Sequence, residues 1–255
     1  MRVITLNVNG IRSAAAKGLF PWLATQKADV ICLQEVRATE SQLQGHNVAL
    51  PGYHAAYYPA VRPGYAGVAL YSREAPQRLV RGIGIDEFDQ EGRYLEAHFP
   101  HVAVVSLYLP SGSAGDHRQA SKERFLKAFL PHLRALKRRR RHYILCGDWN
   151  IAHRQIDLKN WRGNQRNSGF LPHERAWLDE LFDEVGFLDA FRHVETGPDH
   201  YTWWSNRGQA WAKNVGWRID YQIASPKLAG KARGAQIYKA SRFSDHAPLI
   251  MDYEF

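Results

Sequence analysis

Acidic, amide and imidazole side chains interrupt five strand-like apolar segments of this 255-residue chain, and their types could support metal or acid–base chemistry. An ionisable group at the end of a buried strand costs desolvation energy unless a partner or ligand compensates it. Any one of these residues alone is more often a turn residue or a hydrogen-bonding partner of the backbone. In chain order the set is Asn7 with Asn9, Glu35, Asp148 with Asn150, Asp220, and Asp245 with His246.

If the strand ends converge on one rim, the set becomes an oxygen-rich cluster. Carboxylate and amide oxygens suit hard divalent cations, so we expect Mg²⁺, with Mn²⁺ as a substitute. Zinc is disfavoured because Cys32 and Cys146 both lie inside apolar runs, and no Cys-x₂-Cys or His-x₃-His spacing occurs. A metal held by carboxylates can offset phosphate charge while a carboxylate activates water, which is the chemistry of phosphodiester hydrolysis.

The charge balance favours a polyanionic partner. Lys and Arg number 34 against 25 Asp and Glu, which gives a formal net charge of +9. Basic side chains neutralise phosphates and release counterions, so nucleic acid is a natural partner. No apolar run reaches the roughly 18 residues that span a bilayer, and the N-terminus has no secretory signal pattern. We therefore expect a cytoplasmic protein that does not bind membranes.

Short β-rich runs recur along the whole chain and must position these polar residues. The expected strands are Arg2–Asn7, Val30–Gln34, Gly67–Ser72, Tyr94–His98, Val102–Leu109, Tyr143–Asp148, Trp217–Ala224 and Leu249–Tyr253. Helical periodicity predicts helices over Gly18–Gln26, Ser121–Lys137 and Pro172–Val185. Strand pairs without an intervening helix outnumber βαβ units, so we expect an α/β fold with mixed, largely antiparallel sheets flanked by helices. No repeat or long linker divides the chain, which predicts one domain over residues 1–255.

Six ordered motifs run from residue 6 to residue 249 and cover nearly the whole chain. They are LNVNGIR (6–12), LQE (33–35), YLPSG (108–112), GDWN (147–150), NVGWRIDY (214–221) and SDHAPL (244–249). Through these motifs the chain resembles the exonuclease III family of abasic-site (AP) endonucleases, part of the endonuclease/exonuclease/phosphatase superfamily. The resemblance implies a four-layer α/β sandwich with two packed mixed sheets and the active site at one end.

The resemblance also implies roles around a metal ion. Glu35 matches the principal metal ligand, assisted by Asn7, and Asp245 matches a supporting ligand or a second metal position. Asp148 matches the residue that activates or orients the attacking water, and Asn150 the amide that fixes that water and Asp148. Both are therefore also expected close to the metal.

Three further residues match groups that act on the scissile phosphate. His246 is expected to contact the phosphate, oriented and charged by Asp220, because a paired carboxylate raises the imidazole pKa and fixes its tautomer. Tyr108 matches a phenol that hydrogen-bonds the phosphate.

DNA contacts are implied elsewhere in the chain. Asn164 and Asn167 resemble amides that hold DNA phosphates, and Arg207 is the one side chain in segment 205–208 large enough to insert into the base stack. The residues matching the walls of a pocket for an extruded abasic sugar are Trp203, Trp217 and Ile219.

Gly169 matches a position whose size separates internal incision from action at 3′ ends alone, and a small residue there leaves room for an internal sugar. On local grounds Gly169 could equally serve a turn before the helix at Pro172. Clustered aromatics near residue 210 likewise fit either stacking on DNA or packing. Two departures from relatives are Asn9, where several carry Asp, and Ser111, where some carry Asn.

The resemblance therefore predicts a monomeric DNA-repair phosphodiesterase that cuts double-stranded DNA 5′ to abasic sites and removes 3′ blocking groups or 3′ nucleotides. One alternative is a catalytically silent, RNA-associated regulator resembling catabolite-repression control proteins. Another is a superfamily phosphatase acting on inositol phosphates or sphingolipids. Retention of Glu35, Asp148, Asn150, Asp220 and His246 favours an active enzyme.

Overall fold

The computed structural model describes residues 1–254. Each of the eight expected β-rich runs contains a strand, and five further strands occur where none was expected. The strands are β1 (Arg2–Asn7), β2 (Val30–Gln34), β3 (His54–Tyr58), β4 (Val68–Ser72), β5 (Arg78–Arg81), β6 (Tyr94–His98), β7 (Val102–Tyr108), β8 (His142–Asp148), β9 (Leu188–Asp189), β10 (Trp203–Trp204), β11 (Gly216–Trp217), β12 (Asp220–Ala224), β13 (Ala232–Ile237) and β14 (Leu249–Tyr253). Among the described residues, no helix combines the length and apolar character needed to cross a bilayer.

The α-helices lie in the segments that connect the strands. They are α1 (Ile11–Ala16), α2 (Leu19–Thr25), α3 (Asp86–Asp89), α4 (Asp116–Arg138), α5 (Trp161–Asn164), α6 (Pro172–Asp179), α7 (Ala190–Val194) and α8 (Pro226–Ala229). Two 3-10 helices, η1 (Glu40–Leu43) and η2 (Gln155–Asp157), and a π-helical segment, η3 (Glu180–Val185), complete the set.

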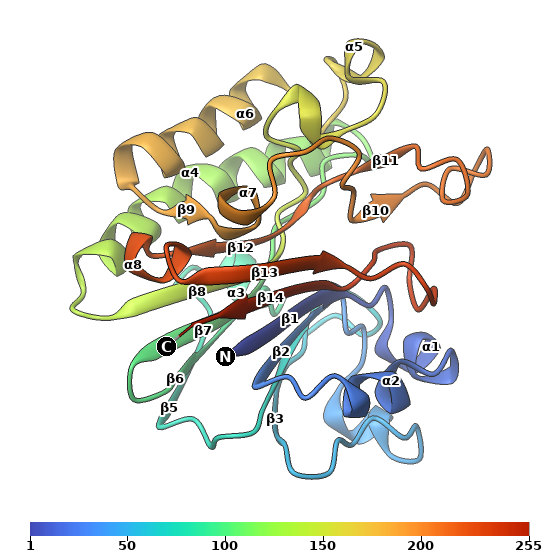
Figure 1. Ribbon diagram of the computed structural model, residues 1–255, viewed down its shortest axis with the longest axis vertical. Coiled ribbons are helices and arrows are strands. Elements are labelled where there is room, and N and C mark those ends of the chain that lie inside the picture. Colours follow the sequence, from blue (N-terminus) through green and yellow to red (C-terminus); the bar gives the residue numbers. More distant parts are fainter. Residues whose placement is uncertain (255) are drawn as a thin grey trace.

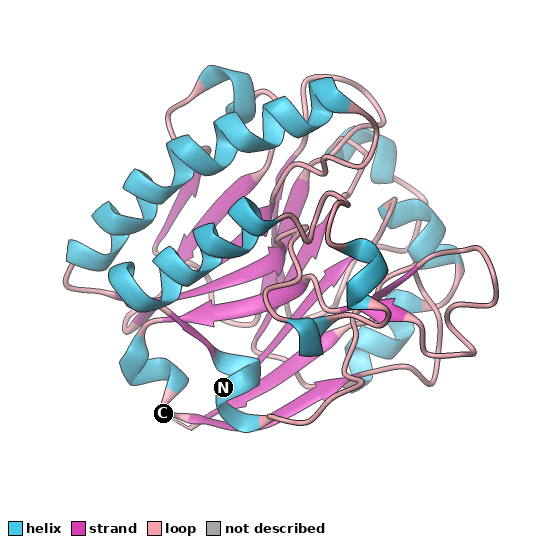
Figure 2. Ribbon diagram, turned by 90° about the horizontal axis from the view of Figure 1, so that it is seen from above, coloured by secondary structure: helices cyan, strands magenta, loops and turns pink. Residues whose placement is uncertain are grey.

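Two six-stranded mixed sheets pack face to face (Figure 1), in the orders β13-β14-β1-β2-β4-β3 and β5-β6-β7-β8-β12-β9. Each sheet contains one central parallel pair, β1 with β2 and β7 with β8. Helices α4 and α6 cover the outer face of one sheet, and α1 with α2 cover the other (Figures 1 and 2). The predicted four-layer α/β sandwich is confirmed.

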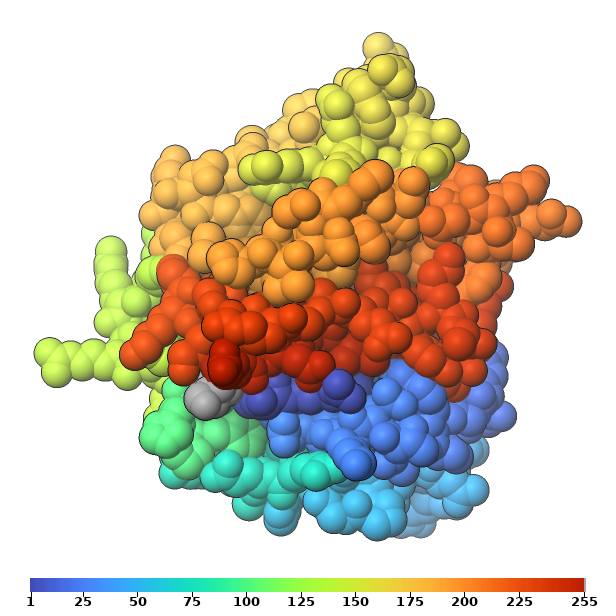
Figure 3. Space-filling model, in the orientation of Figure 1, coloured from blue at the N-terminus to red at the C-terminus, as the bar shows by residue number. Residues whose placement is uncertain are grey.

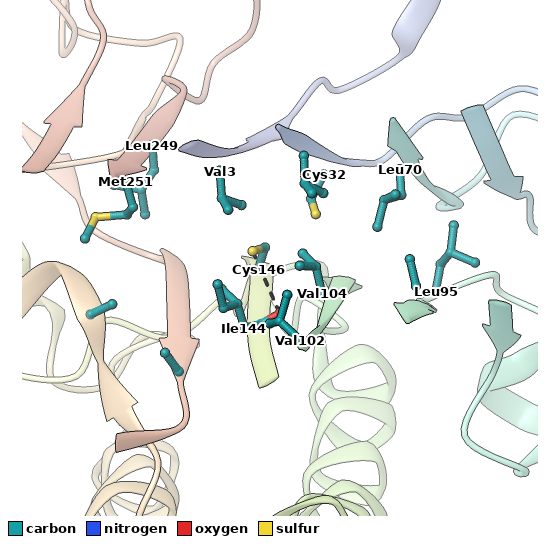
Figure 4. Close-up of a cluster of buried hydrophobic side chains, with 14 of the residues drawn as sticks. Val3, Cys32, Leu70, Leu95, Val102, Val104, Ile144, Cys146, Leu249 and Met251 are labelled. Atoms are coloured by element: carbon teal, nitrogen blue, oxygen red, sulfur yellow. Dashed lines mark hydrogen bonds between the residues drawn. The ribbon is translucent and has the colours of Figure 1, made fainter. Parts of the chain in front are cut away.

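The largest apolar cluster lies between the two sheets. Val3 and Cys32 from the first sheet face Val104 and Ile144 from the second (Figure 4), and all four are almost fully buried. Because helices bury the outer faces as well, central strands are apolar on both sides, and every residue of β7 is buried. Because both faces of the central strands are buried, these strands occur in the sequence as continuous apolar runs.

Polar side chains also connect the sheets across this core. Gln34 Nε2 donates to Ser106 Oγ at 3.0 Å, and Gln222 Nε2 donates to the Val3 carbonyl at 3.0 Å. Buried amides with satisfied hydrogen bonds fix one relative placement of the sheets. The sheet ends that carry the polar residues are thereby held in register.

Several elements differ from the sequence-based expectation. The predicted strand Trp217–Ala224 is two strands, because Thr202 Oγ1 accepts hydrogen bonds from the amides of both Ile219 and Asp220 and interrupts the ladder there. Helix α4 begins five residues earlier than predicted, at Asp116. The predicted helix Pro172–Val185 changes from α to π geometry at Glu180 and ends before Gly186, whose φ is +80°.

Candidate active site

The sheet topology gathers the predicted polar residues at one rim. Parallel strands β1 and β2 end at Asn7 and Gln34, and parallel strands β7 and β8 end at Tyr108 and Asp148. Antiparallel strands β12 and β14 begin at the same rim, since Asp220 pairs in register with Asp148. The polar strand ends therefore meet because of strand direction, although they are far apart in the sequence.

Asp148 accepts three hydrogen bonds at this rim and has a relative exposure of 1%. Its Oδ2 accepts from Asn7 Nδ2 at 2.9 Å and from Asn150 Nδ2 at 3.2 Å, while its Oδ1 accepts from the Asn150 amide at 2.9 Å. Asn150 takes this position with a φ of +52° and donates its Nδ2 to the Leu109 carbonyl. The Asp148 carboxylate is held in a single orientation by amides from both sheets.

The His246 ring lies beside the Asp148 carboxylate, with Nε2 3.9 Å from Asp148 Oδ2. Its Nδ1–H donates to Asp220 Oδ2 at 2.8 Å, which fixes the ring orientation. Burial alone lowers the His246 pKa, but the Asp220 hydrogen bond and the charges of Asp220 and Asp148 raise it to about 10. The imidazole is therefore a buried cation at neutral pH.

The pKa of Asp148 is shifted in the opposite direction from that of a well-paired carboxylate. Burial raises this pKa to about 7, and the charges of Asp220 and Glu35 add to the rise although His246 opposes it. Asp220 Oδ1 is buried and has no hydrogen-bond partner among residues 1–254. One imidazolium thus faces more negative charge than it can compensate.

This excess of carboxylate oxygen fits a divalent cation. Asp148, Asp220 and His246 offer ligand atoms that all lie within 4.8 Å of one another, but the protonated His246 is committed to Asp220 and cannot ligate a metal. The Glu35 side of Asp148 is the better metal-binding region, because Asn7 Nδ2 bridges the two carboxylates at 2.9 Å from each. Arg37 forms an ion pair with the outer Glu35 oxygen.

Tyr108 lies beside Glu35, with only 8% of its surface exposed. Burial and the Glu35 charge raise the pKa of this phenol well above its ordinary value, against the opposing effect of Arg93. The buried Arg93 guanidinium lies 4.7 Å from the Tyr108 ring centroid and donates to the Tyr108 carbonyl at 3.0 Å. Tyr108 is therefore a fixed phenol that keeps its proton.

Asp245 is placed at the rim but already has three side-chain donors. Asn9 Nδ2 and Ser244 Oγ donate to Oδ1 at 2.9 and 3.1 Å, and Trp203 Nε1 donates to Oδ2 at 3.1 Å. Burial would raise the Asp245 pKa, but His246 and these three donors lower it overall. Asp245 thus orients Trp203, and its role as a metal ligand stays a prediction.

These residues line a cleft of about 1150 Å³. Of the predicted site residues, Asn7 and Asp220 lie behind its wall, and the others face it: Glu35, Tyr108, Asp148, Asn150, Asn164, Asn167, Gly169, Trp203, Arg207, Trp217, Ile219, Asp245 and His246. The structure therefore brings the predicted catalytic and DNA-contacting sets into one depression.

An aromatic pocket adjoins the carboxylates. The rings of Trp203 and Trp217 meet edge to face with centroids 6.3 Å apart, and Ile219 packs in the same apolar cluster. Gly169 lies against this wall, since a Cβ built there would be 3.2 Å from Trp217 Cζ3 and 3.0 Å from the Asn150 carbonyl oxygen. Its φ of +92° also requires glycine, so the turn and the pocket interpretations both find support.

The outer parts of the cleft are more exposed. Asn167 Nδ2 donates to Asn164 Oδ1 at 2.7 Å, which makes the two amides one unit at the cleft edge. Arg207 is exposed on the loop between β10 and β11, which projects from the body (Figures 1 and 3). Residues of this loop, Arg207 among them, line the cleft. Nearby Trp204 is fully buried, so that member of the aromatic cluster is a core residue.

Sequence reasoning missed four residues that support the site. Arg37 and Arg93 contact Glu35 and Tyr108, and the buried pair Lys122 and Glu174 lies behind Asn150 and Gly169. Arg37 follows the LQE motif by two residues and could have been noticed. The other three lie inside or next to ordinary secondary-structure patterns and carry no local signal.

Comparison with known proteins gives consistent results. Residues 4–246 match the model of the endonuclease/exonuclease/phosphatase family. An exodeoxyribonuclease of Bacillus subtilis is 39% identical over 253 residues, covering 98% of both chains. The DNA repair nuclease APEX1 of Danio rerio is 37% identical over 260 residues, covering 98% of this chain and 81% of that protein.

Solved structures agree with the sequence relatives. An AP endonuclease from Archaeoglobus fulgidus and a 3′-5′ exonuclease from Neisseria meningitidis each superpose with a TM-score of 0.90 and 26% identity over 100% of both chains. The family match, the relatives and the rim of polar strand ends show that the chain belongs to the endonuclease/exonuclease/phosphatase family, as a hydrolase of the exonuclease III type.

Proposed function

We propose that the chain is a Mg²⁺-dependent phosphodiesterase that cleaves duplex DNA 5′ to abasic sites and removes 3′ blocking groups or 3′ nucleotides. The observation that carries the proposal is the arrangement around Asp148. The Asp148 carboxylate is held by the side-chain amides of Asn7 and Asn150 and lies 3.9 Å from the His246 imidazole, which Asp220 keeps protonated. The apolar cluster that contains Trp203 and Trp217 lines the same cleft. Such a site can activate water, stabilise phosphate charge and hold an extruded sugar at once.

Each side chain then has a distinct task. Asp148, with a pKa raised to about 7 by burial, can orient a water molecule and accept its proton near neutral pH. The His246 cation and the protonated Tyr108 donate to non-bridging phosphate oxygens as negative charge develops. Asn150 keeps Asp148 and the water aligned.

Glu35, with Asp148 and the amides Asn7 and Asn150 nearby, would hold the metal, and Asp245 offers a supporting or second position. Bound there, Mg²⁺ or Mn²⁺ supplies positive charge that offsets the phosphate. Arg37 pairs with Glu35 Oε2 and Asn7 donates to Glu35 Oε1, so a cation bound at Glu35 would share this carboxylate with both residues.

The cleft suits a DNA backbone and a lesion without a base. The net charge of +9 and the amide pair Asn164 and Asn167 favour phosphate contacts that depend little on sequence. Trp203, Trp217 and Ile219 belong to one apolar cluster that lines the cleft and would wall the extruded sugar, with Gly169 adding no side chain there. Arg207 on the projecting loop is positioned to enter the base stack.

The rival functions receive less support. The relatives and structural neighbours named above are nucleases by name, and every catalytic residue of the motifs is kept, which disfavours a silent RNA-associated regulator. A phosphatase of soluble phosphates or lipids would not require the Asn164–Asn167 unit or the basic charge. We further propose that the protein acts as a monomer in the cytoplasm.

The test is cleavage of three matched duplexes, with an internal abasic site, a 3′-phosphate, or no lesion. The wild type should incise the first and dephosphorylate the second in Mg²⁺, and EDTA should abolish both reactions. Gly169→His should suppress internal incision more than 3′ processing, and Gly163→Ala serves as its control because a side chain there meets nothing within 4 Å. A wild type confined to 3′ ends would overturn the internal-incision part of the proposal. Equal loss of both reactions in Gly169→His would assign Gly169 to the turn.

A further inference from the structure

A fully buried ion pair lies beneath the cleft, outside the set of residues that line it. Lys122 on α4 and Glu174 on α6 both have side chains with 0% exposure, and Lys122 Nζ lies 2.6 Å from Glu174 Oε1. Neither faces the cleft. Burying two charges is costly, and an apolar pair of similar volume would often stabilise two packed helices equally well.

Helix packing does not require the pair. The two helices already share an apolar cluster, in which Leu126 and Phe129 of α4 meet Trp177 and Leu178 of α6. Trp177 Nε1 also donates to the Leu126 carbonyl at 2.9 Å. The charged pair must therefore be explained by what else it contacts.

Both members hold segments that line the active site. Lys122 Nζ donates to the carbonyl of Asn150 at 2.8 Å. Glu174 Oε2 accepts from the amides of Gly169 and Leu171 at 2.6 and 3.1 Å. Since a Cβ at Gly169 would lie only 3.0 Å from the Asn150 carbonyl oxygen, the two segments are pressed together at the point where the pair anchors both.

A third segment rests on the same pair. Gln119 Nε2 donates to Glu174 Oε1 at 3.1 Å, and a Cβ at Gly112 would lie 1.9 Å from Gln119 Oε1. The YLPSG loop after β7 therefore packs directly on the Gln119 side chain. The buried ion pair thus contacts two cleft-lining loops directly, after β8 and before α6, and the loop after β7 through Gln119.

We propose that Lys122 and Glu174 are positioning residues for hydrolysis, which hold the Asn150 and Gly169 segments at a fixed separation. The role rests on the proposed function, since it concerns the same site. Displacement of the Asn150 backbone would misalign the amide that orients Asp148, so loss of the pair should lower turnover more than DNA affinity.

The experiment compares the apolar double variant, Lys122→Met/Glu174→Met, with Lys122→Met/Glu174→Gln, and with Arg134→Met as a control that removes an exposed ion pair from the same helix. The apolar double variant should fold, because it leaves no unpaired buried charge. Its kcat on an abasic duplex should fall at least tenfold while KM changes less than threefold. Lys122→Met/Glu174→Gln also leaves no buried charge but keeps one carbonyl oxygen that can accept from the Gly169 and Leu171 amides, so it should lose less kcat than the apolar double variant. Arg134→Met should stay within about threefold of the wild type.

Hydrogen exchange followed by mass spectrometry gives a readout independent of activity. In the apolar double variant the amides of segment 167–171 should exchange at least tenfold faster than in the wild type. Wild-type turnover and exchange in the apolar double variant, or an equal kcat loss in Lys122→Met/Glu174→Gln, would overturn the positioning role. A wild type unable to incise any duplex would refute the proposed function, while the exchange comparison would still decide whether the pair anchors the loop.

Discussion

Two clusters of charged side chains lie at the start of β12. One contains Arg218 and the other Asp220, two residues further along the chain. In the first, Arg218 contacts Asp157 at 2.8 Å and Asp189 at 2.7 Å, and Arg192 contacts Asp157 at 2.7 Å. In the second, Asp220 and Asp148 share the single imidazolium of His246. Asp157 and Arg218 of the first cluster and all three residues of the second are buried, whereas Asp189 and Arg192 are partly exposed.

The pKa values of the carboxylates in the two clusters are nevertheless shifted in opposite directions. Burial opposes ionisation of Asp157, but Arg218 and Arg192 outweigh it and lower the pKa to about 2. Burial raises the pKa of Asp148 to about 7, and the nearby carboxylates add to the rise. Two guanidinium groups balance the two carboxylates of the first cluster within the protein, whereas the second cluster has one imidazolium for two carboxylates. The comparison indicates that the first cluster stabilises the fold and that the second is completed by ligands.

The largest expected effect on function is that of Asp148→Asn. Removing the group that we propose accepts the proton should lower kcat on an abasic duplex by about 10²- to 10⁴-fold, while Kd changes little. Single-turnover cleavage and fluorescence anisotropy measure the two quantities. A collapse of affinity with intact turnover of bound DNA would assign Asp148 to binding.

The matched change in the balanced cluster should act on stability instead. Asp157→Asn leaves the buried guanidinium of Arg218 without its main partner, so the free energy of unfolding should fall by about 3–5 kcal/mol. Urea denaturation measures it. Asp148→Asn should cost far less in the same assay, and comparable losses would remove the distinction between the clusters.

The two clusters should also impose opposite pH dependences on the free energy of unfolding. The Asp157 pKa lies below its ordinary value of 3.8, so its contribution, about 2 kcal/mol, is present above pH 4 and lost as the pH falls toward 2. The Asp148 pKa lies above the ordinary value, so ionising it costs stability as the pH rises from about 4 to 7. Urea denaturation without metal should show this decline in the wild type and a flatter profile in Asp148→Asn. The same decline in the variant would argue against the assignment.

The smallest effect is expected outside both clusters, at Arg207. In an Asp148→Asn background, Arg207→Ala should weaken binding to an internal abasic duplex by about three- to tenfold, because one cationic contact is lost. Anisotropy titrations at two salt concentrations measure it, with Arg134→Ala as a control of equal charge change. Equal effects of both variants would mean that only net charge matters.

The sequence was informative where physical constraints are local. The central strands could be predicted because both of their faces are apolar. Polar residues at their ends, such as Asp148, could be identified because they follow continuous apolar runs. Edge strands β3, β5 and β13 were missed, because their partly exposed side chains carry little apolar alternation. The ion pair of Lys122 and Glu174 was also missed, since a charged residue on a helix is ordinarily solvated and only the packing of α4 against α6 buries it.

The most direct test of the difference between the clusters is a ¹³C NMR titration of the aspartate carboxyls in metal-free protein, repeated with Mg²⁺. Asp148 should titrate near pH 7 in EDTA and at a lower pH when Mg²⁺ is added, because a bound cation supplies the charge that the site lacks. Asp157 should remain ionised down to about pH 3 in both conditions. Titration of Asp148 near pH 4 with no response to Mg²⁺ would contradict the conclusion that this site is completed by a divalent cation.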